Sequence, residues 1–196
     1  MARTEDTDRI CKEAWDRAIW AYGTAQVFDK RGRNYRRKLR LLAFIGIGGP
    51  VLIGGMVIHG LAPNYLPTFL LVVGIVSVVE ALVSLWSLVA TWADDLAFSQ
   101  RSTAENLALS SEFRELGQHC QNPPADLELR FSVLRSKDEG RRAQDAEKGV
   151  TQKELRYGHR SGLRQFQRQC EGCKQTPLSM ESTDCSVCGR FGLFSW

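Results

Sequence analysis

The chain has 196 residues, of which 43% are hydrophobic and 24% charged, and its formal net charge is +4. These averages are typical of a soluble protein, but none of the 26 basic and 22 acidic side chains except Glu80 lies within residues 41–93. This distribution excludes a single globular core. We also expect no secretory signal peptide, because the first 40 residues contain no apolar stretch and carry acidic residues early.

The N-terminal region, residues 1–40, predicts a cytoplasmic amphipathic helix followed by a basic segment. Between Asp8 and Phe28, apolar side chains recur at helical spacing on one side. These are Cys11, Trp15, Ala18, Ile19 and Tyr22. We expect this side to pack against another cytoplasmic helix. Binding to a membrane surface is the alternative, and the net negative charge of residues 1–29 disfavours it for anionic lipid.

Two apolar runs, Leu41 to Leu61 and Leu66 to Trp92, are each long enough to cross a hydrocarbon core, since about 20 helical residues span roughly 30 Å. Only residues 62–65 separate them, so residues 41–93 predict a transmembrane helical hairpin with both tails on one side. A hairpin buried in a soluble core would need apolar partners that the rest of the chain lacks. Short-loop basic residues mark the cytoplasmic side. They are Lys30, Arg31, Arg33, Arg36, Arg37, Lys38 and Arg40.

The second apolar run carries polar residues at spacings of three and four, which predict one helix face. They are Ser77, Glu80, Ser84, Ser87 and Thr91. A charged group at the bilayer centre costs about 2.5 to 3.5 kcal/mol, so Glu80 should face protein or water. The face either packs against other helices or lines a pore. Both require a homo-oligomer or a partner, because one hairpin has too few helices to surround a pore.

Residues 94–168 predict further cytoplasmic helices. Two apolar-periodic stretches, 94–118 and 125–135, precede the highly charged residues 137–149, which indicate a solvated helix or linker rather than a site. Thr151 and Glu154 form a capping box that begins a last helix. Four arginines then repeat every four residues to form one basic stripe, either a solvated surface or a contact for phosphate or nucleic acid. They are Arg156, Arg160, Arg164 and Arg168.

The C-terminal residues 169–196 contain two CxxC pairs with eleven residues between them. The four cysteines are Cys170, Cys173, Cys185 and Cys188. Four thiolates at such spacing are typical of structural Zn²⁺, so we predict a small zinc ribbon with a loop between two short strands. A redox dithiol pair or an iron-sulfur cluster is the alternative. The remaining cysteines, Cys11 and Cys120, are predicted to be free buried thiols.

These features together resemble a known bacterial family. The pattern CxxC, eleven residues, CxxC near the C-terminus is the pattern for which a family on mobile elements is named. The order of N-terminal helix, basic segment, membrane hairpin and long cytoplasmic helix resembles the SLATT superfamily. The resemblance implies an inner-membrane effector of an anti-phage or mobile-element conflict system, which oligomerises into a pore or disrupts the membrane when a sensor encoded nearby signals. Such sensors include nucleotide-signal synthases and reverse transcriptases.

The expected fold class is therefore an all-α membrane protein with a two-helix transmembrane hairpin, cytoplasmic helices, cytoplasmic termini and a C-terminal zinc ribbon. We expect no enzyme, because the chain has no nucleotide-binding glycine loop or nucleophile motif and its histidines are scattered. They are His59, His119 and His159. The alternative function is a membrane-anchored scaffold whose zinc ribbon docks a partner protein or nucleic acid.

Overall fold

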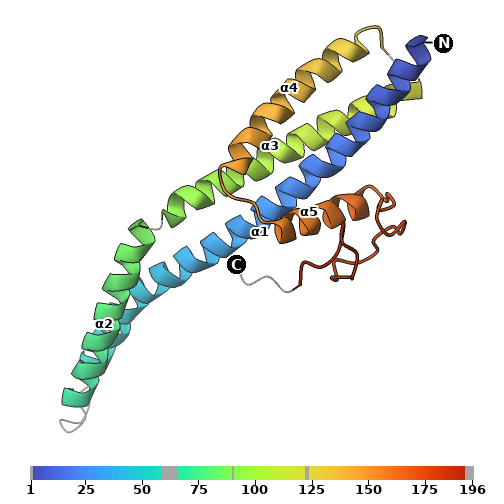
Figure 1. Ribbon diagram of the computed structural model, residues 1–196. Helices are drawn as coiled ribbons and strands as arrows, with labels where there is room; N and C mark the ends of the chain where they lie inside the picture. The colour runs from blue at the N-terminus through green and yellow to red at the C-terminus, as the bar shows by residue number, and fades with distance from the viewer. Residues whose placement is uncertain (1, 59–65, 90, 122–123, 193–196) are drawn as a thin grey trace. The chain divides into compact units, whose positions relative to one another are not determined.

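The computed structural model describes residues 2–58, 66–89, 91–121 and 124–192. For residues 2–4, 47–58, 66, 69, 87–89 and 121 it describes only the backbone. Within these ranges the chain is helical and contains no strand, as the all-α prediction requires (Figure 1). The elements are α1 (Ala2–Ile58), α2 (Leu66–Val89), α3 (Trp92–Gln118), a 3₁₀ turn (His119–Gln121), α4 (Leu127–Ala146) and α5 (Gln152–Gln165). Among the described residues, no helix is both long enough and apolar enough to cross a membrane.

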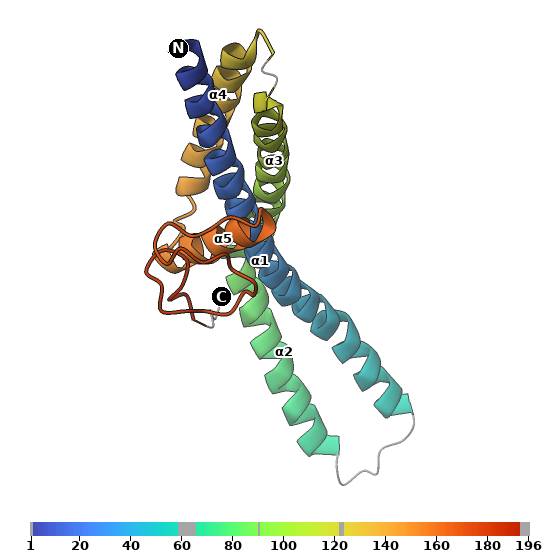
Figure 2. The same cartoon turned by 90° about the vertical axis from the view of Figure 1, so that its right-hand side faces the viewer.

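The chain divides into two compact units, the first of which contains Met1–Arg31 and Ser99–Trp196. In this unit the N-terminal part of α1 packs with α3 and α4 around an apolar core (Figure 2). The buried core residues are Ile10, Ala14, Ala18, Ala21, Leu109, Phe113, Leu116, Leu127, Phe131 and Leu134. Three of the four core residues on α1 are alanines, whereas those on α3 and α4 are leucines and phenylalanines, which lets the three helices approach closely.

Residues 137–146 lie within α4, and most of residues 137–149 are exposed, as expected for a solvated helix. Three of their charged side chains, Asp138, Arg141 and Asp145, are nevertheless buried, which the sequence did not predict. The carboxylate of Asp145 accepts hydrogen bonds from Ser102 Oγ at 2.7 Å and from Asn106 Nδ2 at 2.7 Å. Buried charges are tolerated when they are paired and hydrogen-bonded. The high charge density of α4 therefore serves the inside of the bundle as well as its surface.

Helix α5 crosses α1 at glycines. A Cβ atom on Gly158 would lie 2.6 Å from the Gly23 carbonyl oxygen, and one on Gly23 would lie 2.5 Å from the Gly158 oxygen. A Cβ atom on Gly162 would collide with the Ile19 carbonyl oxygen. The two backbones touch because none of these glycines carries a side chain. The predicted capping box is confirmed, with Thr151 and Glu154 making both reciprocal bonds at the start of α5.

Cys11 and Cys120 form a disulfide, so the prediction of two free thiols is wrong. Cys11 lies near the beginning of α1, and Cys120 lies in the 3₁₀ turn after α3. One helical turn after Cys11, the Trp15 indole packs against Gly117 of α3, where a Cβ atom would lie 2.8 Å from the indole nitrogen. This close approach of α1 to the end of α3 brings together two cysteines that are 109 residues apart in the sequence. Local sequence patterns cannot predict a pairing at that separation.

The second unit, Gly32–Phe98, contains the rest of α1, α2 and the first residues of α3. The Nζ atom of Lys38 lies 5.5 Å from the ring centroid of Tyr35 and 5.3 Å from that of Trp92. Large apolar side chains cover the outside of α2 and are 37 to 66% exposed. They are Leu70, Leu71, Val72, Ile75, Val76, Val78, Val79, Leu82, Val83, Leu85 and Trp86.

Candidate metal centre

The four cysteines of the two CxxC pairs lie together in the loop after α5. Their sulfur atoms are all within 4.8 Å of one another. The Sγ atoms of Cys170 and Cys185 are 3.9 Å apart, and those of Cys173 and Cys188 are 3.8 Å apart. Zinc–sulfur bonds of about 2.3 Å in a tetrahedron place sulfurs about 3.8 Å apart. The residues present therefore fit one tetrahedral metal ion.

Two similar turns hold the cysteine pairs. The Cys170 carbonyl accepts the N–H of Lys174 at 2.8 Å, and the Cys185 carbonyl accepts the N–H of Gly189 at 2.9 Å. Only glycine fits at position 189, because a Cβ atom there would collide with the Thr183 carbonyl oxygen. The two strands predicted for the ribbon are not found in residues 169–192, which form turns and loops. The turns alone bring the sulfurs together.

The four thiols differ in exposure and acidity. Cys170 and Cys188 are fully buried, whereas Cys173 and Cys185 are half-buried. Hydrogen bonds from the backbone N–H groups of Cys188 and Val187 lower the pKa of Cys185 to about 6. Burial raises the pKa of Cys188. A bound cation would favour the thiolate form of all four, since metal ligands must be deprotonated.

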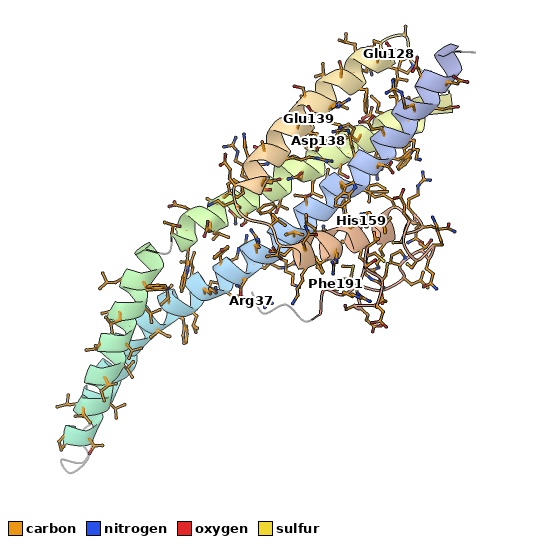
Figure 3. The ribbon with its side chains drawn as sticks, in the orientation of Figure 1. Arg37, Glu128, Asp138, Glu139, His159 and Phe191 are labelled. Carbon is orange, nitrogen blue, oxygen red and sulfur yellow. A yellow bond between two sulfur atoms is a disulfide. The ribbon has the colours of Figure 1, made fainter. Side chains whose placement is uncertain are left out.

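Arg160 of α5 reaches into this loop and is only 6% exposed. Its Nε donates to the Ser179 carbonyl at 2.8 Å. Its Nη1 lies 3.4 Å from Thr183 Oγ1, 3.5 Å from the Cys188 carbonyl oxygen and 3.8 Å from Cys188 Sγ. The Arg160 guanidinium thus connects α5 both to the segment between the two cysteine pairs and to the second pair itself. Phe191 lies near the end of this loop (Figure 3). Its ring contacts that of Tyr157 at 5.7 Å between centroids, which holds the end of the loop against the same helix.

The prediction of one basic stripe is wrong, because the four arginines have different surroundings. Arg156 is half-buried, whereas Arg164 is exposed and donates its Nε to the Leu178 carbonyl at 3.1 Å. Arg168 follows the end of α5, and its guanidinium lies 4.9 Å from the Trp15 ring centroid. A continuous exposed row of arginines is therefore not present.

The polar face predicted for α2 is only partly formed. Ser77 and Ser84 are exposed, and Glu80 is half-buried. A Cβ atom on Gly46 of α1 would lie 2.7 Å from Glu80 Oε1, so the carboxylate rests against the α1 backbone within the same hairpin. Thr91 is not on this helix face, because α2 ends at Val89 and Thr91 adopts a φ of 50° before α3. The side chain of Ser87 lies outside the described residues.

The break after α2 has a physical reason. Asp94 and Asp95 lie in the first turn of α3, where acidic side chains favour a new helix N-terminus, and Asp95 N–H donates to the Thr91 carbonyl at 2.9 Å. Sequence reasoning therefore extended the second apolar helix three residues too far. It also missed the Gly158 and Gly162 contact, although this small-xxx-small spacing is visible in the sequence.

Fold and site together define an all-helical protein with a C-terminal four-cysteine centre able to hold a metal ion. A family model described as mobilome CxxCx(11)CxxC protein matches residues 11–191. The chain belongs to this family, as the cysteine spacing predicted. The match does not reach the wider SLATT superfamily, which stays a prediction. Neither a curated protein nor a solved structure matches the chain.

Proposed function

We propose that Cys170, Cys173, Cys185 and Cys188 bind one structural Zn²⁺. The supporting observation is the pair of sulfur–sulfur distances, 3.9 and 3.8 Å, which suit zinc–thiolate bonds. A loop without strands and with few apolar residues gains its folding free energy from such a metal. Four protein ligands leave no open position, so the ion is structural and supplies no catalytic step.

Metal analysis of the purified chain tests this proposal. About one zinc per chain is expected, and Cys173→Ser should lose it because three thiolates remain. Ser186→Ala, a change between the second pair of cysteines that removes no thiolate, is the matched control and should keep the metal. An iron signal, or zinc retained in Cys173→Ser, contradicts the assignment.

We propose further that the chain is an inner-membrane effector of an anti-phage or mobile-element conflict system. In this proposal α2 and the apolar part of α1 form a membrane hairpin with cytoplasmic termini. The observation that carries it is the row of large apolar side chains left exposed on α2, such as Leu82 at 61% and Trp86 at 63%. Isolated apolar residues are common on protein surfaces, but a contiguous apolar patch marks contact with lipid or another protein.

Charge and aromatic residues support the same orientation. Lys38 is one of the basic residues before the apolar run, and its Nζ atom lies within 5.5 Å of the ring centroids of both Tyr35 and Trp92. Tyr and Trp favour the membrane–water interface, and basic residues favour the cytoplasmic side. Membership in a family of mobile elements supports the conflict-system role. Reporter fusions at Met1 and Trp196 test the topology, and a periplasmic signal from either one refutes it.

The effector acts by oligomerising, because one hairpin cannot enclose a pore. Glu80 is partly shielded by the α1 backbone at Gly46, whereas Ser77 and Ser84 are exposed. Copies that associate through α2 would bury these polar groups or place them around water, which lowers the cost of a charge in the bilayer. In the proposed cycle, a sensor encoded nearby triggers this association.

Membrane potential provides the test, measured in cells that express the chain with and without its genomic neighbours. Wild type with its neighbours should depolarise the cells, Glu80→Lys should change ion selectivity or abolish the effect, and Glu80→Gln should be milder. Equal depolarisation by wild type, Glu80→Leu and Glu80→Lys means that Glu80 does not line the path. No depolarisation by the activated wild type refutes the effector and favours a scaffold, whose docking surface would include the 80% exposed Leu178.

A further inference from the structure

Arg160 is a buried cation whose partners are unusual for this protein. Arg141, with 4% of its side chain exposed, pairs with the carboxylates of Asp145 and Glu105. Arg17 pairs with Asp138 at 2.6 Å, and Arg31 pairs with Glu154 at 2.6 Å. Arg160 is 6% exposed, and no carboxylate pairs with it in the part of the chain that the structure describes. A buried charge without a counter-charge is strongly unfavourable.

The groups around the Arg160 guanidinium identify its counter-charge. Its hydrogen bonds go to neutral oxygen atoms of Ser179, Thr183 and Cys188. The remaining contact is the fully buried Cys188 sulfur, 3.8 Å from Nη1. Four thiolates and one Zn²⁺ carry a formal charge of −2, and this charge is spread over the sulfur atoms. The metal-loaded cysteine cluster would therefore place a negative charge in direct contact with Arg160.

We infer that Arg160 is a positioning residue that supplies the counter-charge of the metal–thiolate cluster. Metal binding and the docking of the cysteine loop on α5 are then a single event, because each supplies the charge that the other needs. Without metal, the buried guanidinium loses its anion and the loop separates more readily from the helix. This inference rests on the zinc site proposed above and is independent of the membrane role.

The test separates charge from hydrogen bonding at one position. Arg160→Lys keeps the positive charge and loses the planar fork, whereas Arg160→Gln keeps a hydrogen-bond donor and loses the charge. The matched control is Arg164→Gln, one helical turn away, because Arg164 also donates to a loop carbonyl but is exposed. Zinc affinity is measured on the full chain in detergent by competition with a chromophoric chelator. Cobalt absorption reports whether four thiolates still coordinate.

Arg160→Gln should bind zinc about 10 to 100 times more weakly than wild type, in the range typical of residues that support metal ligands. Arg160→Lys keeps the charge and should lose clearly less affinity than Arg160→Gln, and Arg164→Gln should bind zinc as wild type does. If the Lys and Gln variants lose zinc affinity equally, the effect comes from the hydrogen bonds of the planar guanidinium rather than from its charge, and the inference is overturned. Zinc binding by Arg160→Gln as tight as by wild type overturns it too.

Two further results of these measurements are decisive. If Arg160→Gln does not fold, Arg160→Lys decides alone, and a tenfold or greater loss of affinity in that variant refutes the role of charge. If wild type binds no zinc, the zinc proposal itself fails together with this inference. If wild type binds zinc and the Arg160 variants bind it equally tightly, the zinc proposal stands and only the counter-charge role of Arg160 is refuted.

Discussion

Replacing Gly158 with alanine tests the close crossing of α5 and α1. The new Cβ atom would lie 2.6 Å from the Gly23 carbonyl oxygen and 3.1 Å from Val27 Cγ2. Carbon and carbonyl oxygen ordinarily approach to about 3.3 Å, so the two helices must separate by roughly 0.7 Å. The obstructing oxygen belongs to the backbone, so no side-chain rotation can relieve the contact.

The expected size follows from two opposing effects. An alanine in a helix interior is more favourable than a glycine by about 1 kcal/mol. Overpacking a well-packed contact costs about 1 to 3 kcal/mol, and the backbone obstruction puts Gly158 at the upper end. The net loss is about 2 kcal/mol, which corresponds to a decrease in Tm of roughly 4 to 8 °C.

Gly140 of α4 offers the matched control, because a Cβ atom there would meet nothing within 4 Å. Gly140→Ala should therefore stabilise the protein by about 1 kcal/mol. Thermal unfolding followed by helical circular dichroism measures both variants. If Gly158→Ala is as stable as Gly140→Ala, the two helices do not cross at these glycines and the described packing is wrong.

Three other predictions concern the same unit. Removing the disulfide with Cys11→Ser should cost about 4 to 5 kcal/mol in denaturant unfolding, because it closes a loop of 109 residues, and full alkylation of all six cysteines in the unreduced wild type would contradict the bond. Asp145→Ala should cost about 3 to 5 kcal/mol because it leaves Arg141 buried with a weakened partner set, whereas the exposed Glu139→Gln should change stability little in the same assay. Burial holds the pKa of His159 below its ordinary value of 6.5, so the unfolded chain takes up the proton first and stability falls as the pH decreases through and below 6.5. His159→Gln should flatten that pH dependence of Tm, and an unchanged slope would exclude His159 as its source.

Local patterns in the sequence were sufficient for local structure. Thr151 and Glu154 lie three residues apart, and the cysteine pairs are each closed by a single turn, so spacing alone predicted the capping box and the four-cysteine centre. The burial of α4 charges depends on Ser102 and Asn106 of α3, about forty residues earlier. No spacing within α4 indicates those partners, so its charge density predicted a solvated segment.

The same contrast between local spacing and distant partners explains why the arginines of α5 do not form the single basic stripe that their spacing predicted. In a helix with 3.6 residues per turn, Gly158 and Gly162 share a face, and Arg160 lies about 200° away from Gly158. The glycine face meets α1, so Arg160 points to the opposite side, where the cysteine loop folds back along α5 (Figure 1). A short helix covered on both sides has no solvent face at Arg160, however polar its sequence. The two glycines therefore identify the face of α5 that is buried against α1, and the arginine between them lies on the opposite face, against the four-cysteine loop.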